Sequence, residues 1–79
     1  MTFVQLEYLV AVDTHRHFVK AAAACFVTQP TLSMQLLKLE QELGIKIFDR
    51  SKQPVVATHA GTELILHARK ILSERNNML

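Results

Sequence analysis

Residues 27–44, "VTQPTLSMQLLKLEQELG", constrain the fold most, because they predict one helix with a marked start and a marked end. Thr28 suits the N-cap position, and Pro30 falls in the first turn, where a missing N–H costs nothing. Gly44 suits the position just after the last turn. The same stretch has one apolar face, which consists of Leu32, Leu36, Leu39 and Leu43. We therefore expect a helix that buries one side in a core.

The opposite face of this helix begins without charge, since the first ten residues of the stretch contain no Asp, Glu, Lys or Arg. A helix that is simply solvated on its polar face ordinarily carries charged side chains there. Amide and hydroxyl groups both donate and accept hydrogen bonds, which suits them to the edges of DNA bases. Uncharged polar residues at a helix start also serve as simple capping residues, so this stretch alone leaves both interpretations open.

Two further helices are predicted before it. Residues 2–14 begin with Thr2 and Gln5 in the spacing of a capping box, and carry an apolar stripe. That stripe consists of Phe3, Leu6, Leu9 and Val10. Residues 16–26 form a short alanine-rich segment, whose small side chains let a neighbouring helix approach closely. Only about three residues, 26–28, then precede the third helix, which is the length of a helix-turn-helix connection.

Residues 45–61 differ in character and predict a small β-hairpin. Ile45 and Ile47 alternate with Lys46, and a second β-rich run follows the polar "RSKQP". Pro54 fits an edge strand, which a two-stranded ribbon permits.

The chain then predicts a last helix, which Thr58 caps and which runs to residue 79. Its apolar surface is wider than a lone helix on a small domain requires, so it either folds back on its own domain or meets a second chain. The predicted fold is therefore mainly α. A winged helix-turn-helix over residues 1–58 is followed by a long linker helix over residues 59–79, and we expect the chain to be the N-terminal part of a longer protein.

Composition narrows the possible functions. The net charge is +2 and the sequence pI is about 9.0, which is compatible with nucleic acid. A single cysteine excludes an internal disulfide and is typical of a cytoplasmic protein, and no apolar run approaches a membrane span. We find no glycine-rich phosphate loop, no paired carboxylates and no nucleophile with a base, so we expect neither an enzyme nor a cofactor. The four histidines and the cysteine are too scattered to suggest a metal site.

The sequence resembles the N-terminal domain of LysR-type transcriptional regulators. The resemblance rests on "LEYLVAV", on "HFVKAAAACFVTQPTLSMQLLKLEQELGIKIFDR" and on "THAG", and it covers essentially the whole chain. Within the family, "HRHF" and the cysteine that ends the second helix resemble the peroxide-responsive activators. The resemblance implies sequence-specific binding to double-stranded DNA, with the helix-turn-helix at residues 18–37. The alternative that we retain is a winged-helix module that docks a partner protein.

The resemblance also implies particular contacts with DNA. The positions that match those reaching bases or nearby backbone are Gln29, Pro30, Ser33 and Met34. The positions that match phosphate contacts are Thr28, Thr31 and Lys38. Arg50, with Lys52 and Gln53 at the tip, matches the wing that lies along the minor groove. Two positions depart from the pattern, because Met34 and Leu37 stand where members often carry Arg or Lys, which weakens the expectation of polar contacts there.

For the last helix, the resemblance implies antiparallel pairing with its copy in a homodimer that binds an interrupted inverted repeat, and higher oligomers of the longer parent. The candidate dimer residues are Leu64, Ile65, Ala68, Leu72 and Leu79. Cys25 follows Phe18 and Ala22 on an apolar stripe, so we expect a buried thiol that does not respond to peroxide by itself. If the parent is of the LysR type, we expect its effector domain to lie beyond residue 79.

Overall fold

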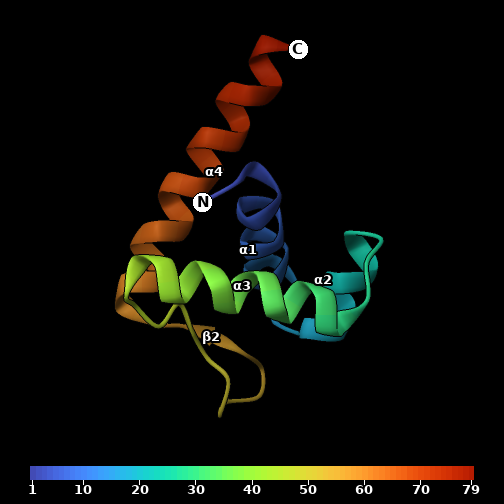
Figure 1. Ribbon diagram of the computed structural model, residues 1–79, viewed down its shortest axis with the longest axis vertical. Helices are drawn as coiled ribbons and strands as arrows, with labels where there is room; N and C mark the ends of the chain where they lie inside the picture. The colour runs from blue at the N-terminus through green and yellow to red at the C-terminus, as the bar shows by residue number, and fades with distance from the viewer.

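The computed structural model describes all residues from 1 to 79 and confirms the predicted winged helix-turn-helix fold (Figure 1). All four helices contribute to the core, a two-stranded antiparallel sheet forms the wing, and the C-terminal end of the last helix extends away from the third helix and the wing. In chain order the elements are α1 (Phe3–His15), α2 (Phe18–Ala24), α3 (Gln29–Leu43), β1 (Phe48–Asp49), β2 (Val56–Ala57) and α4 (His59–Met78).

Helix α1 starts with the predicted capping box. The Gln5 backbone N–H donates to Thr2 Oγ1 at 3.1 Å, and the Thr2 N–H donates to Gln5 Oε1 at 3.0 Å. The predicted apolar stripe needs one correction, because Phe3 is 52% exposed. The residues that α1 buries are Gln5, Leu6, Tyr8, Leu9 and Val12.

Helix α2 is shorter at both ends than the predicted segment 16–26. Arg16 adopts a left-handed conformation, with φ of 52°, and this ends α1. His17 then caps α2 through Nδ1, which accepts from the Lys20 N–H at 3.2 Å. At the other end Phe26 is left-handed, with φ of 59°, and the Val27 N–H donates to the Ala22 carbonyl at 3.1 Å. This 6→1 bond stops the helix, although Phe is an unusual residue for that position.

Helix α3 has the boundaries that its sequence predicts. Thr28 Oγ1 accepts from the Thr31 N–H at 3.4 Å, Pro30 lies in the first turn, and Gly44 ends the helix in a left-handed conformation with φ of 69°. Leu32, Leu36 and Leu39 are completely buried, and only Leu43 is half-buried. The leucine face therefore packs into the core, as expected.

The wing is a smaller hairpin than the sequence suggests, since each strand has two residues and Phe48 pairs with Ala57. Ile45, Ile47 and Pro54 lie outside the strands. Ile47 is nevertheless completely buried, and its carbonyl accepts from the Thr58 N–H at 2.9 Å.

Helix α4 begins at the predicted cap, where Thr58 Oγ1 accepts from the Gly61 N–H at 3.0 Å. Gly61 packs so closely against Ile47 that a Cβ added there would lie 2.0 Å from the Ile47 carbonyl oxygen. Two ion pairs join α4 to α1: Arg69 to Asp13 at 2.8 Å, and Arg75 to Glu7. None of the four helices combines the length and the apolar character that a membrane crossing requires.

Candidate nucleic-acid interface

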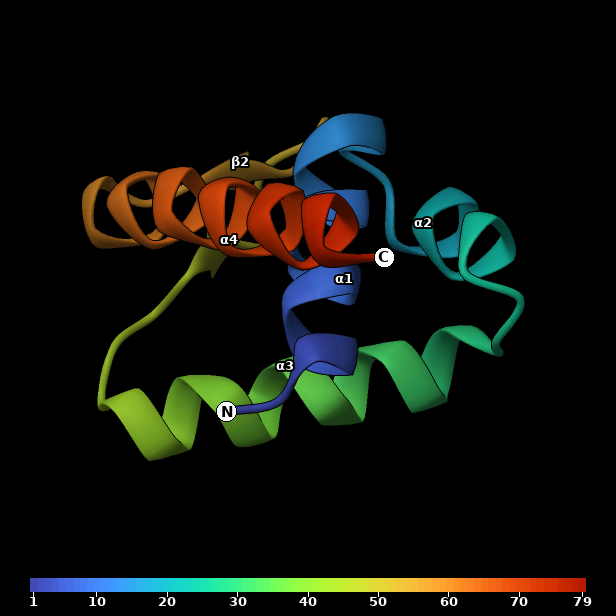
Figure 2. The ribbon, with the colours of Figure 1, turned by 90° about the horizontal axis from the view of Figure 1, so that it is seen from above.

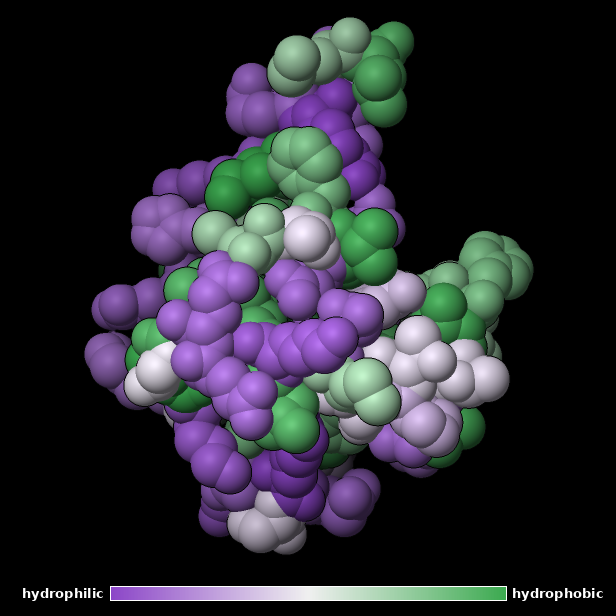
Figure 3. Space-filling model, viewed as in Figure 1, coloured by the Kyte–Doolittle hydropathy of each residue, from purple (hydrophilic) through white to green (hydrophobic).

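Helix α3 runs along one side of the molecule, with α1 and α4 behind it (Figures 1 and 2). Since its leucines face inward, its other face meets solvent. The outward residues Thr28, Pro30, Thr31, Met34, Leu37 and Lys38 are exposed, whereas Gln29 and Ser33 are half-buried. In Figure 3 strongly hydrophilic residues predominate over the C-terminal part of α3 and over the wing, with apolar ones between them, whereas the residues over the N-terminal end of α3 are mostly weakly polar. The uncharged start of the helix is thus a solvent-facing surface.

Two side chains on this surface, Gln29 and Ser33, are hydrogen-bonded to each other. The Gln29 amide donates through Nε2 to Ser33 Oγ at 2.9 Å, one helical turn further along. This bond leaves the Ser33 hydroxyl hydrogen free to donate, and it leaves the Gln29 carbonyl oxygen and the second amide hydrogen unused. An adjacent donor and acceptor on one amide match the N6 and N7 groups of adenine.

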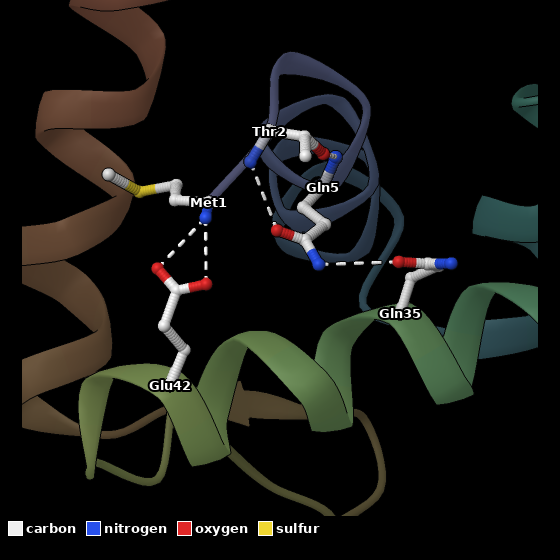
Figure 4. A network of polar contacts seen from close by, with 5 residues as sticks. All are labelled: Met1, Thr2, Gln5, Gln35 and Glu42. Atoms are coloured by element: carbon white, nitrogen blue, oxygen red, sulfur yellow. Dashed lines mark hydrogen bonds and ion pairs between the residues drawn. The ribbon is translucent and has the colours of Figure 1, made fainter.

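A polar network positions α3 from behind (Figure 4). The Gln5 amide of α1 donates to Gln35 Oε1 at 3.2 Å, and the Met1 ammonium contacts both carboxylate oxygens of Glu42, at 2.7 and 2.8 Å. The Glu42 side chain is half exposed, so its ion pair contributes little stability. The orientation of α3 therefore depends chiefly on the hydrogen bond between Gln5 and Gln35 and on the buried leucines of α3.

The wing presents its predicted tip residues Lys52 and Gln53 to solvent. The turn before the tip is held by Asp49, whose Oδ1 accepts from the Ser51 N–H at 3.0 Å and from the Ser51 hydroxyl at 2.5 Å. These bonds, the hydroxyl first, lower the pKa of the Asp49 carboxyl, and the charges of Lys52 and Lys46 add to the effect. Asp49 is thus ionised at neutral pH within a basic loop.

Arg50, predicted as a wing contact, is partly engaged within the domain. Its Nη2 lies 3.3 Å from Glu40 Oε1, and its guanidinium carbon lies 5.0 Å from the centroid of the Phe18 ring. The side chain remains 37% exposed, so part of the guanidinium still faces solvent. Neither Glu40 nor Phe18 was predicted as a residue of this site. No local pattern marks them, because their contact depends on how α2, α3 and the wing meet.

A shallow hollow lies where the starts of α2 and α3 approach the wing, and its lining includes His17, Gln29 and Gln53. The structure thus brings the predicted base reader Gln29 beside the predicted wing residue Gln53. His17, the N-cap residue of α2, lies beside them.

The candidate dimer residues of α4 divide into three groups. Ile65 and Ala68 are buried in the core of their own domain, which corrects their assignment to a partner surface. Leu64 and Leu72 are half-buried against the same core, and Leu79 is exposed. Contacts within one chain therefore account for most of the apolar periodicity of α4.

A different set of apolar side chains is uncovered beside α4. These side chains line two adjoining hollows between the last turns of α4 and the start of α1. We call this set the α1–α4 apolar face, and it comprises Met1, Phe3, Ile71, Met78 and Leu79.

Cys25 is half-buried at the end of α2 rather than fully buried as expected. Burial is the main cause that raises the pKa of its thiol, and the charge of Glu7 raises it further. The thiol is therefore protonated at neutral pH. No three of the His, Cys, Asp and Glu side chains come together in a way that could hold a metal ion.

A capped helix pair joined by a tight turn, with the second helix exposed beside a β-wing, defines the winged helix-turn-helix class of protein. Residues 3–62 match the family model of the bacterial regulatory helix-turn-helix protein, lysR family. The chain belongs to this LysR family.

Similar proteins agree with this assignment. The hydrogen peroxide-inducible genes activator of Pectobacterium carotovorum and the DNA-binding transcriptional dual regulator OxyR of Escherichia coli K12 are each 50% identical over 74 residues, which is 94% of this chain. The chain spans 24% of the length of each, so it corresponds to about a quarter of these relatives.

Solved structures match the whole fold. The BenM DNA-binding domain in complex with benA site 1 DNA is 40% identical and superposes with a TM-score of 0.96, over 99% of this chain and 88% of that one. Full-length OxyR from Pseudomonas aeruginosa is 42% identical, with a TM-score of 0.94 over 99% of this chain and 26% of that one.

Proposed function

We propose that this chain is the sequence-specific DNA-binding domain of an OxyR-like bacterial transcription regulator, with α3 in the major groove. The observation that carries the proposal is the solvent-facing start of α3, where the linked Gln29 and Ser33 side chains offer donors and an acceptor without any charge. Groups of this kind discriminate between bases, whereas charges mainly add affinity for phosphates. Thr28 and Thr31, and Lys38 further along α3, are exposed and suit phosphate contacts.

The wing suits contact with the neighbouring minor groove. Lys52 and Gln53 are exposed at its tip, and the free part of the Arg50 guanidinium lies at its base. The similar BenM domain was solved with DNA, which supports this mode of binding. A regulator that binds chromosomal DNA acts in the bacterial cytoplasm, so we infer that location and a role in transcription rather than catalysis.

The α1–α4 apolar face suits a second copy of the chain. Exposed apolar patches mark contact surfaces, and this one consists of side chains at the start of α1 and on α4 that the domain core leaves uncovered. A twofold dimer through α4 requires two half-sites on one face of the duplex, which an interrupted inverted repeat provides. We infer further that a longer parent protein forms a higher oligomer.

Selection from a library of random duplex DNA tests the proposal. We expect the chain to enrich an interrupted inverted repeat, and the insertion of five base pairs between the half-sites to abolish tight binding, because the half-sites then face opposite sides of the duplex. Affinity for the selected site should fall steeply with salt, since phosphate contacts release counterions. A chain that enriches no sequence, or that binds a protein partner with no salt-dependent DNA binding, would support the docking module instead.

A further inference from the structure

Glu40 is a buried carboxylate on the recognition helix, with 8% of its surface exposed. Both of its oxygens are used by the segment that follows α3. Oε2 accepts from the Ile47 backbone N–H at 2.8 Å, and Oε1 lies 3.3 Å from Arg50 Nη2. The Glu40 side chain therefore connects α3 to the residue before β1, Ile47, and to the residue after β1, Arg50.

Arg50 is held from a second side. Its guanidinium lies over the Phe18 ring of α2, and that ring meets Phe48 of β1 edge-on, with centroids 6.3 Å apart. Two residues thus fix one guanidinium, since Glu40 holds its Nη2 and Phe18 covers one of its faces. The remaining N–H groups are left for solvent or for a phosphate.

A buried carboxylate contributes little net stability to a fold, because its desolvation offsets most of what the ion pair contributes. We propose that Glu40 is a positioning residue for DNA binding. It orients Arg50 and thereby sets the wing relative to α3, and it limits the attraction of Arg50 to phosphates of any sequence. This role rests on the proposed function, since it matters only if the chain discriminates between DNA sequences.

The variant Glu40→Gln tests the negative charge of Glu40 separately from the shape of its side chain. Glutamine has nearly the same shape and its Oε1 can still accept from the Ile47 N–H, but it does not hold Arg50 by charge. We expect the ratio of affinities for a selected and an unselected duplex of equal length to fall about tenfold. Binding to the unselected duplex should tighten, and its salt slope should steepen by about one unit, because the freed Arg50 neutralises a further phosphate.

Glu42→Gln is the matched control. Glu42 lies on the same helix, is half exposed, and gives the same change in net charge when it is replaced. We expect Glu42→Gln to leave the affinity ratio within about twofold of wild type. Equal ratios for Glu40→Gln, Glu42→Gln and wild type would overturn the proposal.

A second comparison separates positioning from simple stabilisation. In an Arg50→Ala background, Glu40→Gln should change the affinity ratio no further, because Glu40 acts through Arg50. A full additional loss in that background would overturn the proposal. If Glu40→Gln unfolds the chain, the Arg50→Lys variant serves as the test instead. A lysine ammonium cannot lie flat on the Phe18 ring while it also binds Glu40 and a phosphate. Arg50→Lys should then give a similar fall in the ratio, and an unchanged ratio would overturn the role. A wild-type chain that enriches no sequence would overturn the proposed function and this role with it.

Discussion

Gln29 Nε2 donates to Ser33 Oγ at 2.9 Å, so two outward side chains on successive turns of α3 form one hydrogen-bonded unit. In the chain without DNA, this hydrogen bond restrains the rotamers of both side chains. The loss of either one therefore removes its own contacts and also frees its neighbour.

The first prediction is that these two residues contribute non-additively to recognition. Gln29→Ala and Ser33→Ala should each weaken binding to the selected duplex by about 1–3 kcal/mol, with little effect on unselected DNA. The double variant should lose less than the sum, because each single change already disrupts the unit. Titration of the four proteins against both duplexes measures the coupling. Strict additivity would show that the bond has no part in recognition, and equal losses on both duplexes would make Gln29 a backbone anchor.

The second prediction concerns Gly61. Alanine ordinarily favours a helix over glycine by about 1 kcal/mol, yet Gly61→Ala should destabilise the fold by about 1–3 kcal/mol or more. The reason is the backbone of Ile47, whose carbonyl oxygen would lie 2.0 Å from the new Cβ. Urea unfolding measures the change. Ala60→Gly, at the exposed neighbouring position, is the control and should cost only about 1 kcal/mol. A Gly61→Ala variant more stable than wild type would show that α4 shifts freely.

The third prediction is that Cys25 is not a peroxide switch in this domain. Because burial and then Glu7 raise the pKa of its thiol, little thiolate exists at neutral pH. Alkylation by iodoacetamide should be slow at pH 7 and should accelerate only in alkaline solution. Cys25→Ser should leave DNA affinity nearly unchanged and lower the free energy of unfolding by about 1 kcal/mol. A peroxide-dependent change in DNA affinity that reductant reverses, and that Cys25→Ser removes, would contradict this expectation.

The fourth prediction is a pH dependence of the wing turn. The pKa of the Asp49 carboxyl is depressed in the fold, so its bonds to Ser51 stabilise the turn above the unfolded pKa. That stabilisation is lost only as the pH falls through the lower folded value, in strongly acidic solution. An NMR titration of Asp49 should give a midpoint below that of an unfolded Asp, and Ser51→Ala should raise it. A midpoint that Ser51→Ala leaves unchanged would exclude Ser51 as the main cause.

Signals that are local in the sequence predicted the helix boundaries of α3 and the start of α1. Thr28 and Gly44 act on their own turns, and the pair Thr2 and Gln5 spans only one turn, so no tertiary information was needed. The ends of α1 and α2 were less predictable. Arg16 and Phe26 take left-handed conformations there without the glycine that usually marks such a position.

Contacts between distant segments could not be predicted. The grouping of Phe18, Glu40 and Arg50 depends on how α2, α3 and the wing are arranged, and periodicity carries no such information. The same limit explains the incorrect placement of Ile65 and Ala68. Their spacing showed that one side of α4 is covered, but the covering surface is the domain's own core.

The fifth prediction follows from that correction and concerns the dimer. Ile71 belongs to the α1–α4 apolar face and is exposed in the single chain, so Ile71→Glu should leave the fold intact and weaken self-association by about tenfold or more. Sedimentation equilibrium of the chain, with and without the selected duplex, measures the effect.

Leu66→Glu is the control for this experiment, because Leu66 is also an exposed apolar residue of α4 but lines a hollow on the wing side, next to Asp13 and Val56. It should leave self-association unchanged. Binding to a single half-site should survive Ile71→Glu, since α3 and the wing are untouched, whereas the advantage of the full inverted repeat over one half-site should disappear. Equal loss of self-association in both variants, or in neither, would show that the α1–α4 apolar face is not the dimer surface.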